Sequence, residues 1–227
     1  MKRRDRAEPG AAQGVPRPSR VQQAARPVGT VRLIGGLYKR SKLQVPDRPG
    51  LRPTPDRVRE TLFNWLGQDM RGRRCLDAFA GTGALGLEAA SRGAAAVCLL
   101  ERDVALVQAL RAQVQRLGAA QVQVQQADAL AWMRSASPSA WDVVFLDPPF
   151  DAAAEAVQAA LAAARPLLAA HGLIYLEAPQ PWSEAMLQPL GLQVQRQGRA
   201  GQVHYHLLAP TLGAAAPALP PEGVPSA

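Results

Sequence analysis

Residues 74–86 read RCLDAFAGTGALG, a short apolar segment that runs through a glycine-rich loop into a helical pattern. Glycine lets the backbone turn sharply and approach a ligand closely, and the first amides of the following helix point toward that ligand. A strand, a glycine loop and a helix in this order therefore predict a binding site where the strand ends.

The loop is compatible with two kinds of cofactor. From Gly81 onward it satisfies G-x-G-x-x-G, and Glu101 lies 20 residues further, as in nicotinamide dinucleotide sites and in methyltransferases. In either case Glu101 would accept hydrogen bonds from ribose hydroxyls. Asp77 favours a cationic sulfonium ligand and would repel a pyrophosphate. Asp128 is placed to bind an adenine amino group, to cap a helix at 128–135, or to do both.

Strand and helix patterns alternate from residue 73 onward. Strands are expected over 74–79, 95–101, 121–126, 142–147 and 172–178, and helices over 84–92, 103–117, 128–135 and 152–169. Nearly continuous apolar strands separated by helices indicate a parallel sheet covered on both faces. Residues 191–208 add a hairpin at the edge of the sheet. The prediction is a doubly wound α/β domain with its ligands beyond the C-terminal ends of the strands.

The fourth expected strand leads into Asp147-Pro148-Pro149-Phe150. Two consecutive prolines remove two N–H donors and stiffen the backbone, which fixes the direction of the Asp147 carboxylate and nearby carbonyls. Such oxygen acceptors can hold an exocyclic base amine in line with a methyl donor and accept its proton. Phe150 offers a flat face to a base taken out of its stack. Glu177, at the end of the fifth strand, lines this site or caps a loop.

Positive charge is concentrated near the N-terminus. The chain carries a formal net charge of +8, whereas residues 1–60 hold 15 Lys or Arg and 5 Asp or Glu, a net charge of +10. This excess suggests a polyanion partner such as nucleic acid, although residues 1–29 alone are equally compatible with a solvated tail that has no partner. Residues 1–29 and 211–227 lack apolar periodicity and are expected to be disordered.

Residues 30–70 form an N-terminal extension ahead of the main domain at 71–210. Residues 30–46 alternate apolar and polar side chains around Gly35-Gly36, which predicts a basic hairpin. A helix is expected to begin at Thr54, with Thr54 as its N-cap and Pro55 in its first position.

Several function classes are excluded. The chain has no apolar run of the ~20 residues that a membrane span needs, and its charged N-terminus is not followed by the apolar segment of a secretory signal. Cys75 and Cys98 lie in expected strands as buried reduced thiols. No Cys/His cluster has metal-ligand spacing. His171, His204 and His206, and likewise Trp132, Trp141 and Trp182, are interpreted as structural or surface residues. We expect a cytoplasmic monomer.

The chain resembles the bacterial 16S rRNA (guanine(966)-N(2))-methyltransferase family over residues 30–208. The likeness rests on Arg32–Gly36, Gly50–Thr54, Asp56–Leu66, Leu76–Glu88, Asp147–Phe150 and Ala200–Val203. It implies a class I, Rossmann-like methyltransferase fold with a mostly parallel seven-stranded sheet. It also implies methylation of a guanine N2 amine in 16S rRNA, as naked RNA or in the small ribosomal subunit, with S-adenosylmethionine as methyl donor. The alternatives are another RNA or DNA base, or a nicotinamide-dependent oxidoreductase.

The resemblance also assigns residues to roles. The cofactor would be held by Thr54, Arg57, Asp77, Phe79, Gly81, Gly83, Glu101 and Asp128, and the target amine by Asp147, Pro148, Pro149 and Phe150. RNA would be contacted by Arg32, Lys39, Arg40, Lys42, Arg52 and Arg59. After Gly35-Gly36 the family usually carries a Gly-Arg pair, whereas this chain has Arg40-Ser41, which keeps the basic character of the hairpin.

Overall fold

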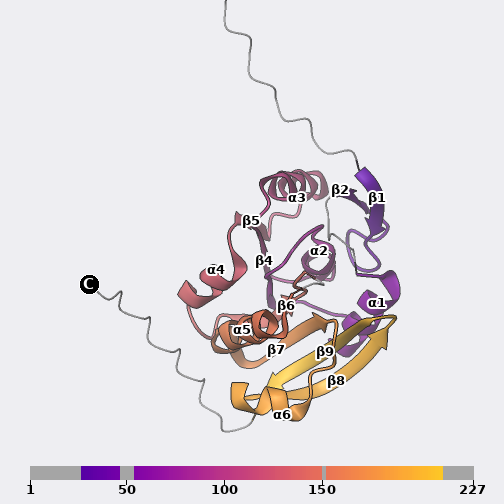
Figure 1. Cartoon of the computed structure of the whole chain (residues 1–227). Coiled ribbons are helices and arrows are strands. Elements are labelled where there is room, and N and C mark those ends of the chain that lie inside the picture. Colours follow the sequence, from indigo (N-terminus) through magenta and orange to yellow (C-terminus); the bar gives the residue numbers. More distant parts are fainter. Residues whose placement is uncertain (1–26, 47–53, 150–151, 212–227) are drawn as a thin grey trace, which may run out of the picture.

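Seven strands form the central sheet of the protein (Figure 1). The computed structural model describes residues 27–46, 54–149 and 152–211. Their order is β5-β4-β3-β6-β7-β9-β8. The strands are β3 (Arg74–Asp77), β4 (Ala96–Glu101), β5 (Val122–Gln126), β6 (Trp141–Leu146), β7 (Leu168–Ala178), β8 (Leu192–Ala200) and β9 (Val203–Pro210). Strands β3 to β7 are parallel, whereas β9 is antiparallel to both of its neighbours. The predicted doubly wound sheet with a C-terminal hairpin is confirmed.

Helices connect successive strands of the sheet up to β8. They are α2 (Ala84–Ser91), α3 (Val104–Leu117), α4 (Ala129–Ser135), α5 (Ala154–Ala164) and α6 (Glu184–Leu187). Short 3-10 turns occupy Arg165–Leu167 and Gln188–Leu190. The labelled helices α2 to α6 lie around the sheet in Figure 1.

Successive residues of each strand serve opposite layers of the core. Cys75 of β3 and Phe145 of β6 pack with α2, α3 and the N-terminal extension, while Leu76 and Leu146 pack with α4, α5 and α6. This alternation follows from the pleat, which points neighbouring side chains to opposite faces. Because both faces are covered, the strands consist of the continuous apolar runs seen in the sequence.

The sheet order reverses between β3 and β6. From β3 the chain moves outward to β4 and β5, and it then returns to place β6 on the other side of β3. In open α/β sheets such a reversal leaves a crevice beyond the C-terminal strand ends. Strand β3 delivers the glycine loop to this crevice, and β6 delivers Asp147.

The N-terminal extension contains a two-stranded sheet and a helix: β1 (Pro27–Arg32), β2 (Lys42–Pro46) and α1 (Asp56–Trp65). The predicted hairpin is confirmed, with its first strand beginning three residues earlier than expected. The prediction that Thr54 is the N-cap of α1 is wrong. Pro55 occupies the N-cap position, and the Thr54 hydroxyl donates to Asp147 instead. Residues 27–29, predicted to be disordered, belong to β1, and Thr211 of the other predicted tail donates its amide to the Gly191 carbonyl at 3.0 Å. Residues 1–26 and 212–227 lie outside the described residues.

The predicted helix at 152–169 ends early. Helix α5 stops at Ala164, a 3-10 turn follows, and β7 already begins at Leu168. Pro166 explains the stop, because proline has no N–H to donate to the helical hydrogen-bond ladder.

Residues without an expected chemical role are structural. Cys75 and Cys98 are free and buried, and burial raises the pKa of their thiols to about 12 and about 11. His206 is buried, accepts a hydrogen bond from the Trp182 amide at 3.2 Å, and has its pKa lowered to about 4 by burial. The described residues include no helix that is long and apolar enough to cross a membrane, and no group of three acid, Cys or His side chains that could hold a metal ion.

Candidate active site

A cavity of about 790 Å³ lies at the C-terminal ends of the parallel strands. Its volume is typical of small-molecule sites, which span roughly 300–1,000 Å³. Six of the predicted cofactor-binding residues line it: Thr54, Asp77, Phe79, Gly81, Glu101 and Asp128. Asp147, Pro148 and Pro149 line the same cavity. The glycine loop and the acid-proline-proline loop therefore face one shared space.

The two loop glycines serve different purposes. Gly81 lines the cavity, and its amide donates to Glu101 Oε2 at 3.0 Å. Gly83 has φ +78° and does not line the cavity. A Cβ on Gly83 would lie 2.7 Å from the Leu110 side chain, so glycine here permits the turn and the approach of α3. Gly83 is a packing residue of the loop.

Asp77 places a buried acceptor at the cavity wall. Its Oδ2 accepts from the Gly86 amide at 2.9 Å, whereas its Oδ1 is buried and has no hydrogen-bond partner in the described chain. Burial, followed by the charge of Glu101, raises the pKa of Asp77 to about 7, although the nearby amides of Gly86 and Phe79 oppose this shift. A buried acceptor without a partner is unusual, and it fits a ligand that brings a donor or a positive charge.

Glu101 and Asp128 are held by backbone amides on the far side of the loop. Glu101 Oε1 accepts from the Asp103 amide at 2.9 Å, which together with the Gly81 amide fixes the carboxylate. Asp128 Oδ1 accepts from the Ala131 amide at 2.9 Å, so its predicted capping role is confirmed. Each carboxylate can accept further hydrogen bonds, and both residues line the cavity. Contact of Asp128 with an adenine amino group stays a prediction.

Asp147 joins the N-terminal extension to the sheet. Thr54 Oγ1, just before α1, donates to Asp147 Oδ2 at 3.3 Å. Burial raises the pKa of Asp147 well above its ordinary value, and the charges of Glu177 and Asp77 add to this effect. Phe150 lies outside the described residues.

Glu177 belongs to the same wall, so of its two alternatives the one that lines the site is correct. It is 6% exposed, lines the cavity and accepts from the Tyr175 hydroxyl at 2.8 Å. Burial raises its pKa, and the hydrogen bond from Tyr175 opposes this shift. Tyr175 is a partner that the strand pattern did not indicate.

The predicted RNA-contacting residues divide into two groups. Arg32, Lys39, Arg40 and Lys42 are exposed on or beside the hairpin, and Arg32 pairs with Asp56 at 3.4 Å. Arg52 lies outside the described residues. Arg57, predicted near the cofactor, is exposed on α1 and does not line the cavity.

Arg59 is not available to RNA, in contrast to the prediction. Its side chain is fully buried, and its guanidinium donates to the carbonyls of Thr54 and Arg32 and to Asp56. It also pairs with Glu88 at 3.7 Å. A guanidinium enclosed in this way cannot reach a phosphate, so Arg59 fastens α1 to the hairpin and to α2.

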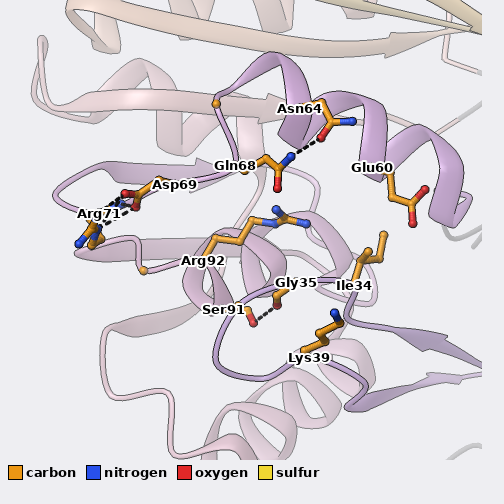
Figure 2. A pocket seen from close by; sticks show the side chains of 13 residues that line it. Ile34, Gly35, Lys39, Glu60, Asn64, Gln68, Asp69, Arg71, Ser91 and Arg92 are labelled. Atoms are coloured by element: carbon orange, nitrogen blue, oxygen red, sulfur yellow. Dashed lines mark hydrogen bonds and ion pairs between the residues drawn. The ribbon is translucent and has the colours of Figure 1, made fainter.

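Buried Glu88 of α2 anchors the loop between β1 and β2. Its carboxylate accepts from the amides of Ile34 and Gly35, both at 2.8 Å, and from Arg92 Nε at 2.8 Å. Figure 2 shows Arg92 beside Gly35 and Ile34 in a second cavity of about 760 Å³. The Glu88 clamp, meaning Glu88 with these two amides, Arg59 and Arg92, therefore ties the extension to the helix that follows the glycine loop.

The charge of the active-site cavity separates the two cofactor classes. Six carboxyl groups line it, from Asp77, Glu101, Asp103, Asp128, Asp147 and Glu177. Among the described residues that line the cavity, Arg102 is the one that carries a positive charge. This lining favours a cationic ligand and opposes a dinucleotide pyrophosphate.

Comparisons with known proteins give the same class. Residues 31–209 match the family described as Conserved hypothetical protein 95. Ribosomal RNA small subunit methyltransferase D of Escherichia coli is 42% identical over 79% of this chain and 89% of its own length. The Haemophilus influenzae protein of that name is 37% identical over 79% of this chain and 93% of its own.

A solved structure agrees with the fold. The structure titled putative methyltransferase yhhF from Escherichia coli superposes with a TM-score of 0.69 at 37% identity, covering 81% of this chain and 99% of the other. The sheet order, the antiparallel hairpin and the cavity position are those of a class I methyltransferase. The chain belongs to the Conserved hypothetical protein 95 family of methyltransferases, together with the ribosomal RNA small subunit methyltransferase D proteins.

Proposed function

We propose that this protein transfers a methyl group from S-adenosylmethionine to the exocyclic N2 amine of a guanine in 16S ribosomal RNA. The observation that carries the proposal is the shared cavity, in which Asp147-Pro148-Pro149 faces the glycine loop and the unpartnered Asp77 carboxyl oxygen. The names of the relatives support small-subunit ribosomal RNA as the substrate.

The lining residues fit this cofactor. Gly81 lets the backbone approach the ligand, Asp77 supplies an acceptor for its ammonium group, and Glu101 supplies fixed oxygens for ribose hydroxyls. Asp128 is positioned for the adenine amine while it caps α4. When bound, S-adenosylmethionine supplies an electrophilic methyl group on a positively charged sulfur.

Asp147 has the chemistry that an aryl amine requires. The lone pair of such an amine is delocalised into the ring, so the nitrogen is a poor nucleophile. A carboxylate that accepts a hydrogen bond from the NH₂ group draws this lone pair toward the methyl donor and can take the proton as it leaves. The two prolines after Asp147 hold the carboxylate in place, which keeps the amine aligned for transfer.

RNA would approach over the exposed basic side chains of the hairpin, Arg32, Lys39, Arg40 and Lys42. Phosphate contacts of this kind supply affinity without sequence preference, so the choice of guanine would rest with the cavity. Nothing in this mechanism needs a second copy of the chain.

The test is transfer of a labelled methyl group to small-subunit RNA and to small-subunit particles, followed by digestion and identification of the methylated nucleoside. The expected product is N2-methylguanine. Asp147→Ala should lower kcat by roughly 100- to 10,000-fold, the range of a lost general base. Asp142→Ala, at the far end of the same strand, is the matched control. Equal transfer by Asp147→Ala and wild type would exclude Asp147 from catalysis, and transfer to another base would overturn the assignment of guanine.

A further inference from the structure

Two carboxyl groups stand at the same level of neighbouring strands, at the cavity end of the sheet. In the parallel pair β6 and β7, Leu146 lies opposite Leu176. The next residues along the two strands are Asp147 and Glu177, and both line the active-site cavity. Residues at one level of neighbouring strands point to the same face, and the strands are about 4.8 Å apart. The register therefore sets the two carboxyl groups side by side.

Protein donors hold one oxygen of each carboxyl group. Tyr175 Oη donates to Glu177 Oε1 at 2.8 Å, and Thr54 Oγ1 donates to Asp147 Oδ2 at 3.3 Å. Burial raises the pKa of Asp147, and the negative charge of Glu177 raises it further, as expected of neighbouring like charges. A ligand edge with two adjacent N–H groups would bond Asp147 Oδ1 and Glu177 Oε2 together and offset this repulsion.

The order of the strands sets the order of the groups along a ligand. Strands β3, β6 and β7 are successive neighbours in the sheet. The first leads into the glycine loop, the second into Asp147, and the third carries Glu177. In the proposed function the methyl donor lies at the glycine loop and the target amine at Asp147. The ring of the base, which lies beyond its amine, then extends toward Glu177.

Among the RNA bases, only guanine has an exocyclic amine next to a ring N–H. The N2 amine of guanine is adjacent to N1–H, whereas the ring nitrogens adjacent to the amines of adenine and cytosine carry a lone pair and no hydrogen. A lone pair turned toward a buried carboxylate is repelled, and the carboxylate loses its donor. Two adjacent carboxyl groups therefore complement guanine and oppose the other two amines.

We propose that Glu177 determines the choice of base: it accepts a hydrogen bond from the ring N–H of the target guanine while Asp147 holds the neighbouring amine. The inference rests on the proposed function and gives a residue to its base specificity. The Tyr175 hydroxyl bond fixes the Glu177 carboxyl group before the base arrives, so the acceptor does not have to be ordered during binding.

The base 2-aminopurine separates the ring N–H from the amine. It keeps the amine that guanine presents, and its neighbouring ring nitrogen carries a lone pair. The experiment replaces the methylated guanine by 2-aminopurine in RNA ligated from a synthetic segment and measures kcat/KM for both substrates. Wild type should prefer guanine by about 10- to 100-fold or more, the range of a hydrogen bond to a charged group. A 7-deazaguanine substrate, which keeps both N–H groups, should react like guanine.

Glu177→Gln is the informative variant. Its amide oxygen can still accept from Tyr175, and its NH₂ group can donate to the ring nitrogen of 2-aminopurine. The preference for guanine should therefore fall by about tenfold or more. The missing O6 of 2-aminopurine counts equally in both proteins, and a ratio does not depend on the fraction of variant that is folded. Glu155→Gln, at the exposed start of α5, should keep the preference of wild type.

The outcomes separate this inference from the proposed function. If Glu177 were merely structural, Glu177→Gln would lower transfer to both bases equally and leave the preference unchanged. That result would overturn the inference and leave the proposed function intact. Wild type that methylates an adenine or cytosine amine, or no RNA at all, would reject the proposed function and with it the choice of base inferred from Glu177.

Discussion

Replacement of Glu88 by glutamine tests how the N-terminal extension is held. The change keeps the shape of the side chain and removes its charge, which leaves the buried guanidinium of Arg59 and the largely buried guanidinium of Arg92 without their shared partner. It also replaces an ionised acceptor of the Ile34 and Gly35 amides by a neutral one. Breaking a buried ion pair on one side costs about 3–5 kcal/mol, because the other charge stays buried.

The expected result is a large loss of thermal stability. For a chain of this size each kcal/mol lowers Tm by about 2–4 °C, so Glu88→Gln should lower Tm by about 6–20 °C. Calorimetry would measure Tm, and urea unfolding would measure the free energy of unfolding. The control is Glu60→Gln, an exposed position on α1, whose free energy of unfolding should stay within about 0.5 kcal/mol of that of wild type. A decrease in Tm below about 3 °C would refute the view that the Glu88 clamp is a buried electrostatic network.

Three further predictions concern the loop, the cavity and the hairpin. Gly83→Ala should cost about 1–3 kcal/mol in urea unfolding, and more than Gly118→Ala, which shares a positive φ but has open space around it. Because the pKa of Asp77 is raised to about 7, the folded protein binds more protons at this group than the unfolded chain does between pH 4 and 7, so the contribution of Asp77 to stability should fall across that window by on the order of 4 kcal/mol and stay level above it. Asp77→Asn should remove this contribution from unfolding curves at several pH values. Lys39→Ala or Lys42→Ala should weaken RNA binding at every sequence and reduce the salt-dependence slope by about 0.7–0.9, whereas an unchanged slope would place that lysine away from the phosphates.

The central sheet could be predicted because its determinants are local. Val143, Val144, Phe145 and Leu146 form a short continuous apolar run, which is typical of a strand buried on both faces. The glycine loop and the acid-proline-proline loop follow such strands directly. Strand ends in a parallel sheet share one edge, so the meeting of the two loops in one cavity followed from their order along the chain.

The roles of Arg57 and Arg59 could not be separated by charge alone. Both are arginines near the start of one helix, and the partner that buries Arg59 is Glu88, distant in sequence. The helical face did contain a signal, because Arg59 shares its stripe with Leu62, Phe63 and Leu66 at spacings of three, four and seven. An arginine on an apolar stripe indicates a buried pair.

Thr54 shows the limit of local capping rules. Its sequence context favours an N-cap, yet its hydroxyl bonds Asp147, 93 residues away. The Asp147 carboxylate, at the cavity, has taken the place of a backbone amide of α1 as the partner of this hydroxyl.

The bond between Thr54 and Asp147 has a consequence for biosynthesis. During translation Thr54 leaves the ribosome 93 residues ahead of its partner, and β7, which carries Glu177, follows later still. A nascent chain that already displays the glycine loop thus lacks one entire wall of its pocket. Cofactor affinity should accordingly arise late and abruptly in a series of stalled chains of increasing length, once β6 and β7 have emerged and paired.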